Sequence, residues 1–204
     1  MLTAIILAAG RARRMGAIKQ LLPWQGERTV LETVVGNVLA SPLVDDEVRV
    51  ILGACSDQVR TVLQGTRDPR LKVLENPHHD RGMLSSIQRG IVDLPETSQA
   101  FMIFLGDQPL VETEIIEALI RYWQGKRPQF LLPVHQGRRG HPVLVSTQYV
   151  PEIAAMGQED GGLRKLIHRY PERVDEFAVD SHAIHIDLDY PEEYRKYRPQ
   201  GEEE

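Results

Sequence analysis

Short apolar runs and segments of helical periodicity alternate along the first two thirds of the chain. The apolar runs predict buried strands at 4–7, 48–52, 72–74 and 101–105. Between them, apolar residues recur at intervals of three and four, which predicts helices over 29–41, 56–64, 83–92 and 112–124. This order is typical of an α/β fold with a doubly wound, mostly parallel sheet. Because such folds bind ligands beyond the carboxyl ends of their strands, the loops after Leu7, Leu74 and Leu105 are expected to converge.

The alternation becomes less regular in the last third of the chain. Strands are predicted at 130–134 and 143–145, and helices near 149–155 and 161–170, which together form a wall over the cleft. A turn rich in glycine and arginine separates the two strands. The segment 184–188 alternates strictly between apolar and polar residues and predicts a further strand, with His185 and Asp187 on the face opposite the isoleucines. A last helix is predicted to start at Pro191.

Composition places the chain among ordinary single-domain proteins. Its 204 residues are 42% hydrophobic and 26% charged, and we expect one domain at 1–198 with an acidic tail at 199–204. No apolar run approaches the roughly 18 residues of a membrane-spanning helix, and no basic stretch of a secretory signal precedes the first strand, so we expect a cytoplasmic protein without a membrane partner. One cysteine, Cys55, makes neither an internal disulfide nor a Cys-based zinc site.

The charges of the chain are segregated. The chain holds 24 basic and 29 acidic side chains, and the net charge of −5 argues against broad nucleic-acid binding. Residues 1–26 carry four basic side chains and no acid, or +4, while the remaining 20 basic and 29 acidic side chains sum to −9. A basic segment in an acidic chain indicates a local site for an anion.

The basic segment follows the first predicted strand. It reads Leu7-Ala8-Ala9-Gly10-Arg11-Ala12-Arg13-Arg14-Met15-Gly16-Ala17-Ile18-Lys19. Small residues after a strand let backbone N–H groups approach a ligand closely, and such a nest binds phosphate. We predict phosphate contacts for Arg14 and Lys19, which lie in this glycine frame, and solvation for Arg11 and Arg13. The segment is neither a Walker loop nor a dinucleotide fingerprint, because both glycine spacings are absent.

A second motif, Leu105-Gly106-Asp107-Gln108-Pro109, ends the most apolar predicted strand. A carboxylate at this place lies at the rim of the cleft and can hold Mg2+ against the phosphates of a nucleotide. A strand-ending aspartate is also a common turn or cap residue. Combined with the basic glycine loop, Asp107 favours metal-assisted phosphoryl-group chemistry.

Together, these motifs resemble those of the MobA-like nucleotidyltransferase superfamily. The resemblance rests on L-A-A-G-x-x-x-R-M-G-x-x-K-x-L-L-P and L-G-D-Q-P, and it extends from residue 1 to about 195. It implies a three-layer, Rossmann-like nucleotidyltransferase fold. The segments most similar to the molybdenum cofactor cytidylyltransferase (MocA) branch are Lys19-Gln20-Leu21-Leu22-Pro23, Gly106-Asp107-Gln108-Pro109 and Arg139-Gly140-His141-Pro142-Val143. Ala8-Ala9-Gly10 stands where guanylyltransferases typically have L-A-G-G, which favours CTP as the nucleotide.

Two positions depart from the family pattern. Ala12 stands where a serine is common, which removes one phosphate donor. The late Gly-Asp-x-Gly-Ala-Arg element of the family reads Gln158-Glu159-Asp160-Gly161-Gly162-Leu163-Arg164 in this chain, so no role is carried over to Asp160.

For the nucleotide side, the resemblance implies main-chain contacts to the base and ribose and side-chain contacts to the triphosphate. The nucleotide-binding residues are then Leu7, Ala8, Ala9, Gly10, Arg14 and Lys19, and the catalytic residues Arg14, Lys19 and Asp107. Asp107 is the implied Mg2+ ligand. Related enzymes complete the metal shell with a carboxylate or amide near the final strand, and we predict Asp187 for this role. Asp189 precedes Tyr190-Pro191 and is also suited to cap the last helix.

For the acceptor side, the resemblance points to the loop after the third strand, to the start of the helix at 83 and to the turn near 139. The implied acceptor-binding residues are Asn76, His78, Ser85, Ser86, Arg139 and His141. A helix N-terminus favours an anion, and a guanidinium fork suits a phosphate or a pterin. The serines can instead cap the helix, and a histidine beside proline is often structural. The His182-x-x-His185-x-Asp187 pattern lacks further zinc ligands and is interpreted as a solvated strand face.

The resulting hypothesis is transfer of CMP from CTP to the terminal phosphate of (molybdenum-)molybdopterin, with release of pyrophosphate. A phosphate monoester is already ionised near neutral pH, so no general base is required. The alternatives are a guanylyltransferase, a sugar- or polyol-phosphate cytidylyltransferase, or a non-catalytic cofactor chaperone. A molybdoenzyme of the xanthine dehydrogenase type is the expected protein partner. A nicotinamide oxidoreductase is disfavoured because the dinucleotide fingerprint is missing.

Overall fold

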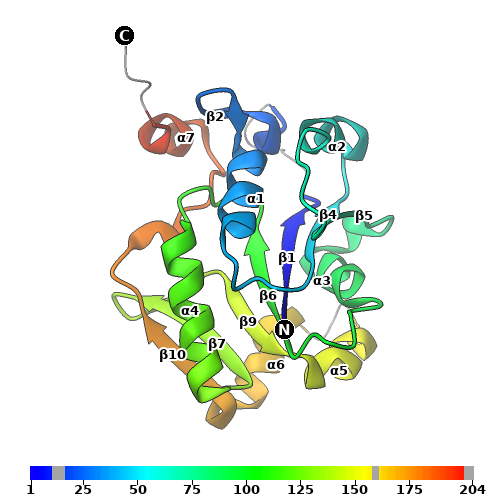
Figure 1. The fold of residues 1–204 in the computed structure, drawn as a ribbon, viewed down its shortest axis with the longest axis vertical. Coiled ribbons are helices and arrows are strands. Elements are labelled where there is room, and N and C mark those ends of the chain that lie inside the picture. Colours follow the sequence, from blue (N-terminus) through cyan, green and yellow to red (C-terminus); the bar gives the residue numbers. More distant parts are fainter. Residues whose placement is uncertain (11–16, 158–160, 200–204) are drawn as a thin grey trace.

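A mixed sheet forms the centre of the structure, a computed structural model that describes residues 1–10, 17–157 and 161–199 (Figure 1). Within these residues the sheet has eight strands. Their order across the sheet is β10 (Val174–Ala178), β7 (Phe130–His135), β9 (Val143–Ser146), β6 (Ala100–Leu105), β1 (Leu2–Ala8), β4 (Val48–Leu52) and β5 (Leu71–Glu75), with β8 (Arg138–Arg139) paired to β7. Strand β9 runs antiparallel to both of its neighbours, and the other pairs along this path are parallel.

The direction of chain winding reverses between β1 and β6. From β1 the chain proceeds through β4 to β5 and then returns to place β6 on the other side of β1. Leu7 of β1 pairs with Leu105 of β6, so the two strands end at the same level of the sheet. Open α/β sheets bind ligands at such a reversal point, which places the expected site beyond Leu7 and Leu105.

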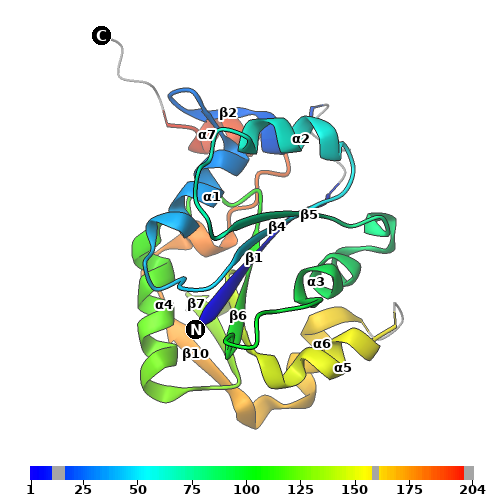
Figure 2. The ribbon, with the colours of Figure 1, turned by 45° about the vertical axis from the view of Figure 1, so that its right-hand side comes forward.

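Helices cover both faces of the sheet, which gives three layers (Figure 2). One face packs against α1 (Val30–Ala40), α2 (Ser56–Leu63) and α4 (Thr113–Lys126). The other face packs against α3 (Met83–Ile91), α5 (Val150–Ala155) and α6 (Gly162–Arg169). Successive residues of β1 alternate between these two cores, with Ala4 and Ile6 in the first and Ile5 in the second. The predicted doubly wound, three-layer α/β fold is therefore confirmed.

The first helix begins where its local sequence predicts. Thr29 is the N-cap of α1, and its side-chain oxygen accepts a hydrogen bond from the backbone N–H of Glu32 at 3.2 Å. The Glu32 carboxylate in turn accepts the N–H of Thr29 at 2.8 Å. This capping box satisfies two N–H groups that a helix leaves unpaired at its start.

The predicted strand at 184–188 is wrong. The chain forms a short 3-10 turn at His182–His185 instead, and Ser181 caps it by accepting the N–H of Ala183 at 3.2 Å. Strand β10 pairs with β7 along the edge of the sheet, so 184–188 has no ladder to join. Its alternation arises because Ile184 and Leu188 are each buried in the packing of a loop.

The C-terminal segment packs beside the loop that follows β1. Helix α7 (Pro191–Tyr197) starts at the predicted proline. The ring of Tyr194 lies 6.2 Å from that of Trp24, in the small hairpin of β2 (Pro23–Gln25) and β3 (Arg28–Thr29), and the Tyr194 hydroxyl donates to the carbonyl of Pro23. The expected acidic tail lies outside the described residues beyond position 199. In the described part of the chain, no helix is long and apolar enough to cross a membrane.

A buried arginine joins the sheet to the end of α3. Arg49 of β4 is 5% exposed. Its guanidinium donates to the carbonyls of Gly90, Val92 and Asp93 at 2.9, 2.6 and 2.7 Å, and to the Glu47 carboxylate at 2.7 Å. Basic groups stabilise the carbonyls at a helix C-terminus, so Arg49 fixes the position of α3 on the sheet.

We predict that Arg49→Leu lowers the free energy of unfolding by about 3 kcal/mol, because several buried carbonyls lose their charged donor at once. Arg67→Leu, at an exposed loop position, is the control and should change stability by less than about 0.5 kcal/mol. Chemical denaturation of both variants measures the difference. Equal stability of the two variants would contradict this role for Arg49.

Candidate active site

A cavity of about 350 Å³ lies where β1 and β6 end. Its walls come from the loop after β1, the loop after β6, the turn that precedes α3 and the segment before α7. The lining residues are Leu7, Ala9, Gly10, Lys19, Gln20, His79, Gly82, Met83, Ser86, Leu105, Asp107, Asp187 and Asp189. The predicted convergence of the loops after Leu7, Leu74 and Leu105 is thus confirmed.

The backbone of the loop after β1 approaches that of the loop after β6 closely. A Cβ atom at Gly106 would lie 3.0 Å from the carbonyl oxygen of Leu7 and 3.2 Å from the Cβ of Ala8. Only a residue without a side chain fits there without moving its neighbours. The small residues that the sequence places at the ends of both strands are therefore required for the two loops to meet.

Lys19 is the cation of this cavity among the described residues. Its Nζ donates to the carboxylate of Asp107 and to Oδ1 of Asp189, the second at 2.9 Å. The short turn Lys19–Leu21 holds its backbone, and the neighbouring Gln20, which is 3% exposed, donates to the carbonyl of Ala8 at 3.4 Å. Burial lowers the pKa of Lys19, but the ion pairs with the two carboxylates outweigh it and the pKa is raised. Lys19 is therefore an ammonium ion at neutral pH.

Asp187 is held beside Asp107 by the residue that follows Asp107 in the chain. Gln108 is 3% exposed, and its Nε2 donates to Oδ1 of Asp187 at 2.6 Å. The backbone N–H of Leu188 also donates to the carbonyl of Asp107 at 3.1 Å. Burial and the negative charge of Asp107 raise the pKa of Asp187.

The donor set fits a divalent cation that brings further ligands with it. Asp107, Asp187 and Asp189 line one cavity with Lys19, so three carboxylates accompany one ammonium group among the described residues of this lining. Mg2+ and Mn2+ prefer such carboxylate oxygens, and Mg2+ commonly uses one or two of them together with phosphates of a substrate. No group of three or more His, Cys, Asp or Glu side chains in the described ranges forms a ready-made metal site. Lys19 lies between two of the carboxylates, so a metal ion bound to both would displace it.

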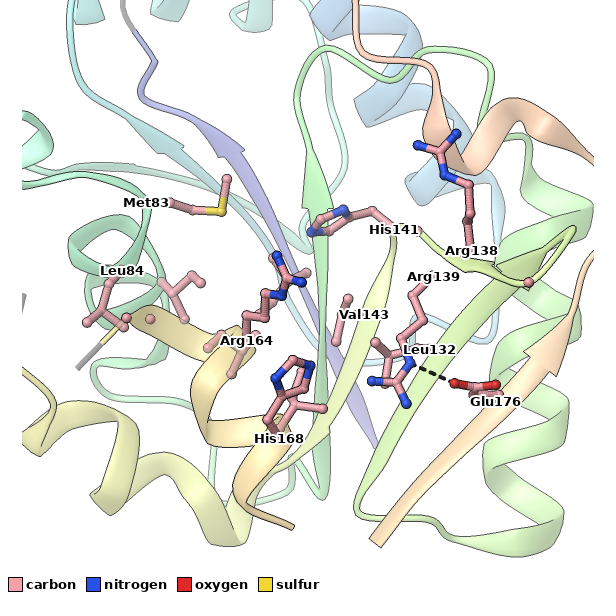
Figure 3. A pocket seen from close by; sticks show the side chains of 18 residues that line it. Met83, Leu84, Leu132, Arg138, Arg139, His141, Val143, Arg164, His168 and Glu176 are labelled. Carbon is pink, nitrogen blue, oxygen red and sulfur yellow. Dashed lines mark hydrogen bonds and ion pairs between the residues drawn. The ribbon is translucent and has the colours of Figure 1, made fainter. Parts of the chain in front are cut away.

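A second, larger cavity of about 740 Å³ adjoins the first (Figure 3). Met83, at the start of α3, lines both. The rest of the larger lining comes mainly from α3, α6 and the β8–β9 region: Leu84, Ile87, Ile103, Leu132, Gly137, Arg138, Arg139, Gly140, His141, Val143, Gly161, Gly162, Leu163, Arg164, Ile167, His168 and Glu176. Its surface combines an apolar floor with basic side chains, which suits a ring-sized ligand that also carries negative charge.

The predicted acceptor residues separate into three groups. Arg139 and His141 line the larger cavity, and Ser86 lines the smaller one. The other three, Asn76, His78 and Ser85, are absent from both linings.

Those three residues form a hydrogen-bond network before α3. Asn76 donates to the hydroxyls of Ser85 and Ser86 at 2.9 and 3.0 Å. The Ser85 hydroxyl donates to the carbonyls of His78 and Gly82 at 2.9 and 2.8 Å. The network ties the turn at His79–Arg81 to the first turn of α3, so these residues fix the start of that helix.

His141 and Arg139 both line the larger cavity, but they differ in charge and in partners. Burial lowers the pKa of His141 more than the charge of Asp107 raises it, so the imidazole is neutral near pH 7. A Cβ at Gly140 would lie 2.3 Å from the carbonyl of Ile184, and glycine there lets the backbone of His141 donate to the same carbonyl at 3.1 Å. The Arg139 guanidinium donates to Glu176 of β10 at 2.6 Å.

The sequence patterns do not identify several residues that line the two cavities. Asp189, which is also suited to cap the last helix, lines the smaller cavity, and the N-cap of α7 is Tyr190. The carboxylate of Glu193 accepts the N–H groups of Asp189 and Tyr190 at 2.9 and 3.0 Å. Gln108 belongs to the quoted L-G-D-Q-P motif, which was a usable signal. His79 and His168 carry no sequence signal of their own, whereas Arg164 stands at the arginine of the late Gly-Asp-x-Gly-Ala-Arg element. Arg14, which is predicted to contact phosphate, and Arg11 and Arg13, which are predicted to be solvated, lie outside the described residues.

The histidines of the His182-x-x-His185-x-Asp187 pattern lie apart from the carboxylate cluster. His185 Nε2 lies 3.0 Å from the carbonyl of Arg138, and the ring of His182 lies 5.9 Å from that of Tyr197. Neither histidine lines the smaller cavity.

Comparison with known proteins identifies relatives along nearly the whole chain. The family model of the MobA-like NTP transferase domain matches residues 4–174. A molybdenum cofactor cytidylyltransferase from Escherichia coli (strain K12) is 29% identical over 142 residues, 70% of this chain and 68% of that protein. A nicotine blue oxidoreductase from Paenarthrobacter nicotinovorans is 28% identical over 203 residues, 94% of this chain and 93% of that protein.

A solved structure shares the fold along nearly the whole chain. The crystal structure of Rv0371c from Mycobacterium tuberculosis H37Rv superposes with a TM-score of 0.78 at 28% identity and 96% coverage of both chains. The same protein has also been solved in complex with manganese, with a TM-score of 0.75 at 28% identity and 97% coverage of both chains.

The raised pKa of Asp187 predicts a stability cost that depends on pH. In metal-free buffer, Asp187→Asn should be more stable than the wild type at neutral pH, because it removes a charge that burial and Asp107 disfavour while keeping an oxygen for Gln108. The folded-state pKa lies above the ordinary value of 3.8, so the advantage should vanish as the pH falls through the folded-state pKa towards 3.8.

Denaturation curves across this pH range measure the difference between Asp187→Asn and the wild type. Asp180→Asn, at an exposed loop position, is the matched control and should follow the wild type. A variant less stable than the wild type at neutral pH would refute the assignment of Asp187 as a disfavoured charge.

Proposed function

The chain belongs to the MobA-like NTP transferase domain family, and from that membership we propose that it transfers CMP from CTP to the terminal phosphate of molybdopterin, with release of pyrophosphate. One observation carries the proposal: Lys19 and three carboxylates face a cavity at the end of β1 and β6, and a second cavity joins it at Met83. A nucleotidyltransferase needs two adjoining sites of this kind, because its nucleotide and its acceptor must meet at one phosphorus atom.

The smaller cavity is the proposed nucleotide site. Ala9 and Gly10 offer main-chain groups to the nucleotide, and the Lys19 ammonium neutralises the triphosphate, whose leaving pyrophosphate carries the growing charge. Arg14 is proposed to act with Lys19. The protein's contribution to the rate is then positioning and charge neutralisation rather than proton transfer.

Asp107 is the proposed metal ligand, with Asp187 or Asp189 as the second. Bound there, a divalent ion such as Mg2+ supplies charge neutralisation and alignment of the phosphate oxygens. The manganese complex of the M. tuberculosis relative supports a divalent ion in this family. Gln108 keeps Asp187 directed towards Asp107, so the second ligand position is preorganised by a side chain of the same loop.

The larger cavity is the proposed acceptor site. Its volume of about 740 Å³ is within the range of small-molecule sites, roughly 300–1,000 Å³. The apolar floor suits a pterin ring, and the phosphate end of the acceptor would extend past Met83 and His141 towards Asp107. Because that phosphate is already ionised, it attacks the α-phosphorus of CTP without a general base. A neutral His141 can hydrogen-bond to the acceptor without opposing the metal ion.

Three further functions are alternatives. A protein that binds the finished dinucleotide and delivers it to a molybdoenzyme would bind the product but release no pyrophosphate. The nicotine blue oxidoreductase is a relative over nearly the whole chain, which favours an oxidoreductase as a second candidate. A loss of NADH absorbance in the presence of an electron acceptor would support that candidate. In the third alternative, CMP is transferred to a sugar or polyol phosphate. Pyrophosphate release from CTP with a panel of such acceptors tests it.

The nucleotide preference should be visible in thermal unfolding. With Mg2+, CTP at about 100 times its Kd should raise the unfolding free energy by about 2.7 kcal/mol, a shift of roughly 5–10 °C for a chain of this size. GTP at the same concentration should produce a smaller shift. A larger shift with GTP would contradict the assignment to CTP.

Asp107 should be required for turnover. We expect Asp107→Ala to lower pyrophosphate release from CTP and molybdopterin by at least about a hundredfold, because one fixed charge on the reacting phosphates is lost. Asp57→Ala, at an exposed position of α2, should retain normal release. Near-normal release by Asp107→Ala would refute the metal assignment, and an inactive wild type that still binds the cytosine dinucleotide would favour the chaperone.

A further inference from the structure

Helix α6 presents two basic side chains to the larger cavity. Arg164 and His168 are four residues apart, so they lie on one face of the helix, and both line the cavity. Figure 3 shows the Arg164 guanidinium extending from α6 into the space between Met83 and His141, with His168 on the next turn. Within the described part of the chain, neither side chain has an ion pair or a hydrogen bond.

The neighbouring arginines are directed elsewhere. Arg139, on the opposite wall, donates to Glu176 at 2.6 Å, and Arg169 of α6 donates to Glu152 at 2.5 Å outside the cavity. Arg138 extends away from α6 in Figure 3. Of the guanidinium groups at this cavity, Arg164 is therefore the one that both faces its interior and has no carboxylate partner among the described residues.

The surroundings of Arg164 make an anionic ligand group the natural partner. Leu132, Val143 and Ile167 are among the apolar residues that line the same cavity. A guanidinium that a ligand covers against apolar walls loses its hydration, which costs free energy unless the ligand supplies a charged acceptor. The imidazole of His168 adds a second donor on the same side.

This anionic group differs from the phosphate that reacts. Lys19 and the carboxylates lie in the smaller cavity, and neither Arg164 nor His168 lines that cavity. The reacting phosphate must therefore pass Met83, which lines both cavities, into the smaller one, and α6, which lines only the larger cavity, contacts a part of the acceptor that stays there.

We propose that Arg164, assisted by His168, binds a second anionic group of the acceptor, one that takes no part in phosphoryl transfer. Arg164 is then a specificity-determining residue of the acceptor site. The inference rests on the proposed function, because it assumes that the larger cavity holds the acceptor. In molybdopterin the anionic chemistry can come from the sulfur atoms of the organic part or from the oxygen ligands of bound molybdenum.

Steady-state pyrophosphate release with Arg164→Gln tests the proposal. The KM for molybdopterin should rise by about tenfold or more, since a charge-assisted hydrogen bond is lost. The kcat and the KM for CTP should change little, because both depend on the other cavity. Arg164→Lys should restore part of the loss, and Arg139→Gln should cost less than Arg164→Gln because Glu176 already binds Arg139. Arg169→Gln, on the same helix but paired with Glu152, is the control and should match the wild type.

Two forms of the acceptor separate the sources of the anion. A higher KM for both metal-free and molybdenum-loaded molybdopterin assigns the contact to the organic part, and a higher KM for the loaded form alone assigns it to the metal's oxygens. An unchanged KM for both forms, with thermal unfolding like that of the wild type, overturns the inference and leaves the proposed function intact.

The inference can also be tested if the proposed function fails. If the wild type transfers no CMP, equilibrium dialysis with metal-free and with molybdenum-loaded molybdopterin compares the wild type with Arg164→Gln directly. Weaker binding of either form by the variant supports the contact, and equal binding of both forms, or no binding by either protein, overturns it.

Discussion

The ion pairs of Lys19 with Asp107 and Asp189 are the constraint on which the site depends. They join three segments that lie far apart in the chain: the loop after β1, the loop after β6 and the residues before α7. The Lys19 and Asp107 side chains are only 14% and 13% exposed, so their attraction acts in a medium that screens it less than water does. With Asp187 beside them, the carboxylates would repel one another without a cation. The site is therefore built to hold positive charge.

The fold supplies this constraint through the reversal of winding between β1 and β6. Strand ends that stop at the same level bring the two motif loops together, and Gly106 lets their backbones approach closely. On the face of the sheet that α3 covers, Arg49 fixes the C-terminal end of this helix. Met83, at the start of the same helix, lines both cavities. One sheet edge thus positions a charged pocket beside a mainly apolar one, which is the arrangement that joining a nucleotide to an acceptor requires.

The parts of this arrangement that depend on local sequence could be predicted. The apolar runs of β1 and β6, the glycine loop with Lys19 and the aspartate after β6 are each visible in a short stretch of chain. The parts that depend on tertiary partners could not. The alternation at 184–188 looks like a strand, but β10, an edge strand containing Asp175 and Glu176, occupies the sheet position beside β7. Glu176, the partner of Arg139, lies on β10, which the apolar pattern does not predict. Arg164 stands in the late family element, but only the structure places it at a cavity.

The most direct test of the account is a crystal structure with Mg2+ and a non-hydrolysable CTP analogue. The account predicts the metal ion on Asp107 and on Asp187 or Asp189, with the triphosphate in the smaller cavity. It also predicts that the Lys19 ammonium has moved from the carboxylates to the phosphate oxygens. A nucleotide bound elsewhere, with the ion pair of Lys19 and Asp107 still intact, would contradict it.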